Sequence, residues 1–260
     1  MPLRVLVTND DGIAAPGLRV LAETLAGAGH EVIVVAPAQD CSGQAAALGP
    51  LHLSGRVEFE RVRLGEREAF AVAGPPALCV MAACLSGFGP RADVVVSGIN
   101  AGANTGRAVL HSGTVGAALT GLNFGLPGLA VSQVAGTAYE WSTAATLAAV
   151  FVDALGSLRH PAVVNLNVPN RPLAALGGLV VAQLDPGGTV QAAMVDREAG
   201  VLELSIPERP AARAGTDSAL VEAGYATVTA LAGPHAVEVG MAQLCLQVER
   251  GLEDRVRRPA

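Results

Sequence analysis

The sequence predicts an α/β protein with a parallel sheet and helices on both faces, followed by a smaller C-terminal part that contains a β-hairpin. Short apolar segments typical of buried parallel strands alternate with longer segments of helical periodicity up to about residue 170. Beyond that point the pattern changes to short alternating segments, which are typical of antiparallel strands. We therefore expect an α/β core at residues 1–170 and an extension at residues 171–260 that serves oligomerisation.

The predicted elements of the core follow one another in strand–helix order. We expect strands at 4–8, 31–36, 92–96, 128–132 and 162–168, extended segments within 51–72, and helices over 18–25, 75–87, 115–124 and 140–158. Residues 12–17 contain too much glycine and proline to be helical. A strand, a helix and a second strand with a right-handed crossover make a parallel βαβ unit at the start of the chain.

The extension contains weaker patterns. We expect an antiparallel segment at 178–184, a hairpin of strands 189–195 and 200–206 joined by a turn at 196–199, a helix at 216–223, a strand at 225–231 and a terminal helix from Met241.

Composition excludes several functional classes. The chain of 260 residues is 51% hydrophobic and 15% charged, which suits a compact folded protein. Its net charge of −6 gives no basic surface for a nucleic acid polymer or an anionic membrane. All 17 basic residues are arginine, so a P-loop lysine, a Schiff-base lysine and a Ser-Lys dyad are excluded.

Location and redox state follow from simple features of the chain. The four cysteines show neither CxxC nor zinc-ligand spacing, and the N-terminus lacks the features of a signal peptide. We expect reduced thiols in a cytoplasmic protein. The apolar stretch 94–139 is interrupted by many glycines and by Pro127, so we do not expect it to span a membrane.

The first strand–helix turn differs from that of a dinucleotide-binding unit. It reads NDDGIAAPG at 9–17 and not GxGxxG, and the carboxylates of Asp10 and Asp11 would repel a pyrophosphate. The Rossmann-like topology is therefore expected without NAD binding.

The adjacent carboxylates of Asp10 and Asp11 indicate a metal site. Two neighbouring carboxylates repel each other and lose solvation when buried, and a hard divalent cation such as Mg²⁺, Mn²⁺ or Ca²⁺ offsets that cost. The alternative is an ordinary turn with solvated carboxylates, because Asp-Gly is a common turn signal. Ser42 and Asn100 also lie just beyond predicted parallel strands, so all four side chains can meet at one edge of the sheet.

A second group of residues is a candidate for phosphate binding. Ser112, Gly113 and Thr114 precede a predicted helix, where they act either as capping residues or as an anion site. Asn9 and Asn104 are further candidates in the neighbouring loops.

With these motifs in view, the sequence resembles the SurE family (survival protein E) of metal-dependent nucleotidases. The motifs are VTNDDG at 7–12, PGL at 16–18, AP with SG at 36–43, VSGIN at 96–100, GANTG at 102–106, SGTVGAA at 112–118 and, more weakly, GTDSALVEAGYATVTAL at 215–231. The resemblance implies a 5'-nucleotidase that releases phosphate from nucleoside 5'-monophosphates, and in some members also acts on 3'-nucleotides or short polyphosphate. It also implies homodimers or homotetramers.

The resemblance further implies one divalent metal ion (Mg, Mn or Ca) per subunit, held by Asp10, Asp11, Ser42 and Asn100. Asp10 or Asp11 can also take a proton from an attacking water molecule, and the sequence leaves open which one does.

The sequence departs from the family pattern at three places: GPPALCV at 74–80, TAL at 229–231, and His111 where a tyrosine usually stands. One hypothesis is that protonated His111 assists phosphate binding or protonation of the leaving oxygen. The other is that its ring fills the space of the tyrosine and hydrogen-bonds a carbonyl group.

Two alternative functions remain. A phospho-receiver domain also places acidic residues after its first strand, but it requires a lysine, which this chain lacks. A non-catalytic nucleotide-binding subunit of the same fold is the second alternative.

Overall fold

The computed structural model describes residues 1–51, 55–155, 160–187, 193–198, 201–205 and 211–235, together with 241 and 245. The strands are β1 (Arg4–Thr8), β2 (Glu31–Pro37), β3 (Phe59–Leu64), β4 (Arg67–Val72), β5 (Val94–Ala101), β6 (Gly128–Gln133), β7 (Val163–Val168), β8 (Leu179–Val181), β9 (Ala193–Glu198), β10 (Val201–Ser205) and β11 (Ala226–Leu231). The helices are α1 (Pro16–Gly27), α3 (Pro76–Cys84), α4 (Gly113–Asn123), α5 (Trp141–Leu155) and α6 (Asp217–Glu222), with short 3-10 helices η1 (Gly106–His111) and η2 (Leu173–Ala175).

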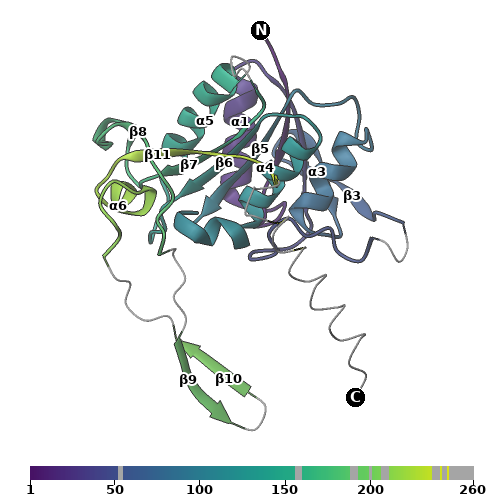
Figure 1. Ribbon diagram of the computed structural model, residues 1–260. Coiled ribbons are helices and arrows are strands. Elements are labelled where there is room, and N and C mark those ends of the chain that lie inside the picture. Colours follow the sequence, from purple (N-terminus) through teal and green to yellow (C-terminus); the bar gives the residue numbers. More distant parts are fainter. Residues whose placement is uncertain are drawn as a thin grey trace, which may run out of the picture.

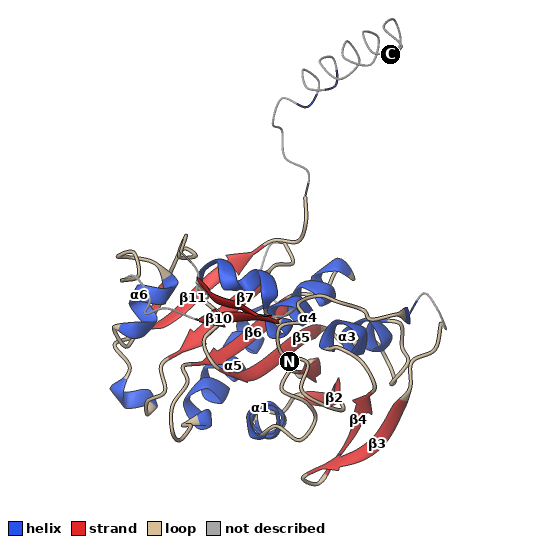
Figure 2. Ribbon diagram, turned by 90° about the horizontal axis from the view of Figure 1, so that it is seen from below, coloured by secondary structure: helices blue, strands red, loops and turns tan. Residues whose placement is uncertain are grey.

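Nine strands form one sheet in the order β3-β4-β2-β1-β5-β6-β7-β11-β8, and β9 pairs with β10 in a separate hairpin (Figure 1). The six strands from β4 to β7 in this order are parallel, whereas β3 is antiparallel to β4 and β11 is antiparallel to β7. Helices α1 and α5 lie on one face of the sheet, and α3 and α4 lie on the other (Figure 2). The predicted α/β fold with a mostly parallel sheet is confirmed.

The central strand β1 is buried on both faces because its side chains alternate between the two layers of helices. Val5 and Val7 pack in the cluster that includes residues of α1 and α5, and Leu6 packs with residues of α3. The chain turns from β1 to β2 and β4 on one side, and later adds β5, β6 and β7 on the other. The carboxyl ends of β1 and β5 therefore flank the topological switch point, where open α/β sheets bind their ligands.

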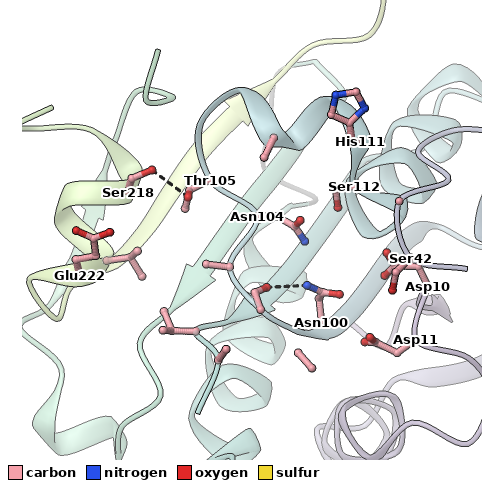
Figure 3. A pocket seen from close by; sticks show the side chains of 18 residues that line it. Asp10, Asp11, Ser42, Asn100, Asn104, Thr105, His111, Ser112, Ser218 and Glu222 are labelled. Atoms are coloured by element: carbon pink, nitrogen blue, oxygen red, sulfur yellow. Dashed lines mark hydrogen bonds between the residues drawn. The ribbon is translucent and has the colours of Figure 1, made fainter. Parts of the chain in front are cut away.

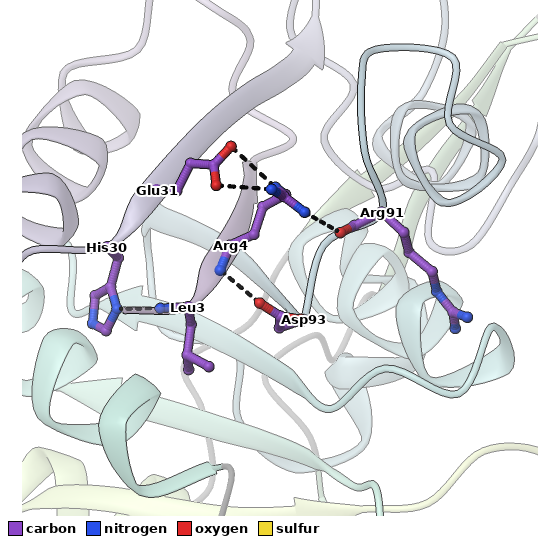
Figure 4. A network of polar contacts seen from close by, with 6 residues as sticks. All are labelled: Leu3, Arg4, His30, Glu31, Arg91 and Asp93. Atoms are coloured by element: carbon purple, nitrogen blue, oxygen red, sulfur yellow. Dashed lines mark hydrogen bonds and ion pairs between the residues drawn. The ribbon is translucent and has the colours of Figure 1, made fainter. Parts of the chain in front are cut away.

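Polar contacts hold the opposite, amino end of β1 (Figure 4). The Arg4 guanidinium forms an ion pair with Glu31 of β2 at 3.0 Å. The backbone N–H of Arg4 donates to the Asp93 carboxylate at 2.7 Å. The Leu3 backbone N–H donates to Nδ1 of His30 at 3.4 Å. These contacts are mostly exposed, so each contributes little to the free energy of unfolding. They join the start of β1 to β2 and to the residue before β5.

The structure corrects two boundaries near the sheet edge that carries the polar loops. Helix α1 begins at Pro16, although residues up to Gly17 were expected in a loop; the first helical turn tolerates proline because its N–H groups have no helical partner. Strand β5 continues through Ser97 to Ala101, although 97–106 was expected to be a loop. It does so because β6 pairs with it on both sides of an irregularity between Ser97 and Asn100, where Gly98 has φ +139°.

In the C-terminal part, β8 pairs in parallel with β11, where an antiparallel segment was expected. The antiparallel hairpin is confirmed, but β9 extends to Glu198 and includes Asp196 and Arg197, which were expected in the turn. Residues 189–192, 199–200 and 206 of that prediction, and nearly all of the terminal helix, lie outside the described residues. Within the described part of the chain, no helix is long and apolar enough to cross a membrane.

Candidate functional site

A cavity of about 520 Å³ opens at the switch point between β1 and β5. Its walls come from the turn after β1, the loop after β2, the end of β5 with the segment through η1, and helix α6 (Figure 3). Asp10, Asp11, Ser42 and Asn100 all line it, so the four predicted metal ligands share one cavity. Asn100 comes from the end of β5 itself and not from a loop beyond it.

Asp10 is almost fully buried, with 3% of its surface exposed. Its carboxylate accepts a hydrogen bond from the Thr114 hydroxyl at the start of α4, and its backbone carbonyl accepts one from the Cys41 N–H at 2.8 Å. Burial raises the pKa of Asp10, and the Thr114 hydrogen bond opposes that rise. Asp10 is thus fixed by α4 on one side and by the loop of Ser42 on the other.

Asp11 is less buried than Asp10 but shares its electrostatic environment. Its pKa is raised to about 6, first by burial and then by the negative charge of Asp10. A backbone hydrogen bond with Ala101 partly opposes this rise. Two acidic groups that lose solvation and repel each other form a site in which a bound cation lowers the free energy.

Ser42 is held by a residue that the sequence did not single out. Its backbone N–H and its hydroxyl both donate to Oδ1 of Asp40, at 2.7 and 2.6 Å. These bonds lower the pKa of Asp40, and they orient the hydroxyl so that its oxygen lone pairs stay available. An aspartate two residues before a serine is the local turn pattern that would have indicated this role.

Asn104 lines the cavity and is held by hydrogen bonds to residues of the sheet. Its backbone N–H donates to Oδ1 of Asn167 at 2.7 Å, and its carbonyl accepts from Asn165 at 2.8 Å and from Asn167 at 3.0 Å. Its side-chain amide donates to the Ser132 hydroxyl on β6 at 2.8 Å. Asn165 and Asn167 are fully buried on β7. Their hydrogen bonds therefore fix the backbone at Asn104 to the interior of the sheet.

The remaining phosphate candidates lie in different environments. Ser112 lines the cavity, and its hydroxyl caps α4 by accepting from the Val115 N–H at 3.1 Å, so the capping role is confirmed.

Thr114 and Asn9 are fully buried and are not among the cavity-lining residues. The Thr114 hydroxyl donates to the Asp10 carboxylate, and the Asn9 side chain donates to the Gly12 carbonyl at 2.9 Å. Gly113 lies against Asp10, where an added Cβ would come within 2.7 Å of the Asp10 Cβ. Phosphate contacts by these residues stay predictions.

Helix α6 closes the end of the cavity away from Asp10 and Asp11. The Ser218 hydroxyl donates to Oγ1 of Thr105 at 3.0 Å, and the Asp217 carboxylate accepts from the backbone N–H of Gly106 at 2.9 Å. Sequence patterns alone did not assign this helix to the site, although it lies in the weaker C-terminal motif at 215–231. His111, at the end of η1, lies exposed at the cavity wall, where both hypotheses for its role remain open.

The donor set at the Asp10 end consists of oxygen atoms. Among the residues that the structure describes, no group of three or more His, Cys, Asp or Glu side chains is arranged to hold a metal ion. Two carboxylates, one hydroxyl and one amide oxygen are instead a set suited to hard divalent cations.

Comparison with known proteins points to one family. The family described as "Survival protein SurE" matches residues 5–196. The protein called 5'-nucleotidase SurE of Aeromonas hydrophila is 39% identical over 242 residues, which cover 88% of this chain and 92% of the relative. The protein of the same name from Xanthomonas campestris is 44% identical over 186 residues, or 70% of each chain.

The fold is shared as well. The crystal structure of the SurE protein from Aquifex aeolicus superposes with a TM-score of 0.72 at 26% identity, covering 88% of this chain and 92% of that one. The chain therefore belongs to the SurE family.

Proposed function

We propose that this protein is a divalent-metal-dependent 5'-nucleotidase, which hydrolyses nucleoside 5'-monophosphates to a nucleoside and inorganic phosphate. The observation that carries the proposal is the meeting of Asp10, Asp11, Ser42 and Asn100 in one cavity at the switch point. Relatives named 5'-nucleotidase SurE, similar over most of the chain, support the activity.

The residues present fit a divalent cation. The buried carboxylate of Asp10 has no cationic side chain beside it among the ion pairs of the described residues, and the pKa of Asp11 is raised to about 6 by burial and by Asp10. A cation held by Asp10, Asp11, Ser42 and Asn100 would remove this electrostatic cost. When bound, such an ion polarises the phosphoryl oxygens and lowers the pKa of a coordinated water molecule.

The residues of the chain have distinct tasks in this proposal. Asp10 or Asp11 accepts the proton of the attacking water molecule, and Thr114 holds the Asp10 carboxylate in place for this. Asn104, fixed by Asn165 and Asn167, presents its side chain to the phosphate from the cavity wall. Water attacks phosphorus directly while the bond between phosphorus and the 5'-oxygen breaks. The leaving oxygen takes up a proton from solvent, and the neutral nucleoside leaves toward α6.

The family also supports proposals about assembly and location. We propose a homodimer or homotetramer with one metal ion per subunit, located in the cytoplasm. Activity toward 3'-nucleotides or short polyphosphate would be secondary to the main reaction.

The decisive experiment measures phosphate release from a nucleoside 5'-monophosphate by the purified protein with Mn²⁺ or Mg²⁺. EDTA should abolish the release, and added metal should restore it. Asp10→Asn and Asp11→Asn should each lower kcat by about two orders of magnitude or more, because each removes charge that binds the cation. Asp153→Asn removes an exposed carboxylate on α5 and serves as the control. Full activity in a metal-free preparation contradicts the proposal.

A further inference from the structure

Asp40 carries a third carboxylate near the proposed metal site, although it does not line the cavity. It lies in the loop after β2, two residues before Ser42, and it is not among the residues of the cavity wall. Its side chain is exposed, and no ion pair of the described residues includes it. Any effect of Asp40 on the cavity therefore passes through a neighbouring residue or through its charge.

Two short hydrogen bonds connect Asp40 to Ser42. Oδ1 of Asp40 accepts from the Ser42 backbone N–H at 2.7 Å and from the Ser42 hydroxyl at 2.6 Å. Both bonds lower the pKa of Asp40, so this carboxyl group is ionised at neutral pH. Because the hydroxyl donates its hydrogen to Asp40, its oxygen lone pairs remain for a cation. A hydroxyl is a stronger donor when its oxygen binds a cation, so the two interactions reinforce each other.

The backbone of the same loop is joined to the turn after β1 by two other hydrogen bonds. The Cys41 N–H donates to the Asp10 carbonyl at 2.8 Å, and the Ile13 N–H donates to the Pro37 carbonyl at 2.8 Å. These bonds lie on both sides of Asp40 in the loop and do not involve its side chain. The loop therefore has anchors that remain when the Asp40 side chain is changed.

The side chain of Asn100 is oriented in a similar way. Its Nδ2 donates to the Gly102 carbonyl at 2.6 Å, which leaves Oδ1 to serve as an acceptor. Figure 3 shows Asn100 and Ser42 on the same cavity as Asp10 and Asp11. The acceptor of the Ser42 hydroxyl is a charged side chain, which a substitution can change, whereas that of Asn100 is a backbone group.

The charge of Asp40 also acts on the two carboxylates in the cavity. Burial is the largest cause of the raised pKa of Asp10 and of Asp11, and the negative charge of Asp40 adds to the rise in each. A third carboxylate that increases the repulsion between two others also increases the free energy gained when a cation binds them.

We propose that Asp40 is a positioning residue for the divalent cation, which orients the Ser42 hydroxyl and adds negative charge beside the site. The inference rests on the proposed function, because it assumes a cation held by the four predicted ligands. Groups that hydrogen-bond metal ligands typically change metal affinity by about 10- to 100-fold when they are replaced.

Direct binding of Mn²⁺ without substrate tests this proposal, measured by the fall in the electron paramagnetic resonance signal of free Mn²⁺. Asp40→Asn removes the charge and keeps an oxygen that can accept both hydrogen bonds, whereas Asp40→Ala removes the charge and the acceptor. We expect the Kd for Mn²⁺ to rise by about threefold in Asp40→Asn, because the lost charge is exposed and screened by water. In Asp40→Ala it should rise by about tenfold or more. Equal Kd values in the two variants would overturn the orienting role.

A double-mutant cycle with Ser42→Ala measures the coupling between the two side chains. The carboxylates of Asp10 and Asp11 remain in that background, so Mn²⁺ should still bind, more weakly. Without the Ser42 hydroxyl, Asp40→Ala should raise the Kd by only about threefold, since only the effect of its charge is left. The same rise with and without the Ser42 hydroxyl would contradict an action through Ser42.

Asp153→Asn is the matched control, because it removes one exposed carboxylate on α5, beside His30, and should leave the Kd unchanged. Thermal unfolding in EDTA checks that each variant is folded, and Asp40→Asn carries the test if Asp40→Ala does not fold. Wild-type Kd values in the folded Asp40 variants would overturn the role of Asp40 and leave the nucleotidase proposal standing. Failure of the wild-type protein to bind Mn²⁺ would overturn both.

Discussion

At the scale of single residues, the hydrogen bond from Thr114 to Asp10 links the helix α4 to the proposed metal site. It favours the ionised form of a carboxylate whose pKa is raised by burial. We expect Thr114→Val to lower kcat/KM by about tenfold or more and to raise the metal concentration needed for half-maximal activity, since hydrogen bonds to charged groups are worth about 1.5–3 kcal/mol. Metal titrations of activity measure both effects.

Thr114→Ser is the control for that variant, because it keeps the hydroxyl and should retain most of the activity. Equal losses in the serine and valine variants would show that the methyl group and not the hydrogen bond matters.

Asp11 has a pKa in the folded, metal-free protein of about 6, above its usual value of 3.8. Because the pKa of Asp11 is higher in the folded protein than in the unfolded protein, protonation of Asp11 stabilises the folded state. This stabilisation is fully present below the usual pKa of 3.8, and it is lost as the pH rises through about 6. In EDTA, Asp11→Asn should therefore be more stable than wild type at pH 7, and this advantage should shrink as pH falls toward 4. Thermal unfolding of both proteins across this range tests the prediction. A constant difference at all pH values contradicts it.

That Asp10, Asp11, Ser42 and Asn100 share one cavity could be predicted from the sequence because each is a polar residue near the end of an apolar strand. The residues that support them could not. Asn165 and Asn167 sit within a strand that reads as buried, and their partner Asn104 is 61 and 63 positions away in the chain. A short local pattern does not reveal a partner at that separation, although asparagine in a buried strand indicates that a partner exists.

At the scale of elements, strand β7 holds the loop that carries Asn104 through side-chain hydrogen bonds. We expect Asn167→Ala to lower kcat/KM by about tenfold with little change in metal affinity, because it removes two hydrogen bonds to Asn104 and leaves Asp10 and Asp11 untouched. Steady-state kinetics and metal titrations separate the two effects.

Thr227→Val on β11 is the matched control for Asn167→Ala. Thr227 is buried, pairs in register with Asn167, and has a hydroxyl without a hydrogen-bond partner. Its replacement should leave kcat/KM unchanged and should not reduce stability. Loss of metal affinity in Asn167→Ala would contradict a role confined to Asn104.

The boundaries of elements were least predictable where pairing partners are distant. The segment VSGINA at 96–101 has the glycine and asparagine of a loop, yet pairing with β6 keeps it in β5. Likewise, the three residues of β8 do not indicate whether the strand is parallel or antiparallel. This depends on its pairing with β11, which lies some 47 positions later in the chain. Strands such as β1 and β2, whose apolar runs end sharply, were predictable from local sequence.

At the scale of the whole molecule, the hairpin of β9 and β10 forms its own sheet outside the large one, and it stands apart from the main body in Figure 1. An isolated two-stranded hairpin is marginally stable in water and needs a surface to pack against. We expect the protein to be a stable oligomer, and sedimentation at micromolar concentration tests this. A monomer would count against the expectation. The division of the chain at residue 170 stays a prediction, and β8 and β11 of the later part extend the large sheet.

The carboxylate of Asp185 joins the two ends of the segment that bears this hairpin. It accepts from the Gly187 N–H at 2.7 Å on the outgoing side, and from the Arg213 N–H and the Thr216 hydroxyl, both at 2.9 Å, on the returning side. The backbone before the hairpin, at Gly187, and the backbone after it, at Arg213, thus both hydrogen-bond the side chain of Asp185. For protein engineering, we expect that a short turn or a foreign domain can replace the segment between them without changing the strand order of the large sheet.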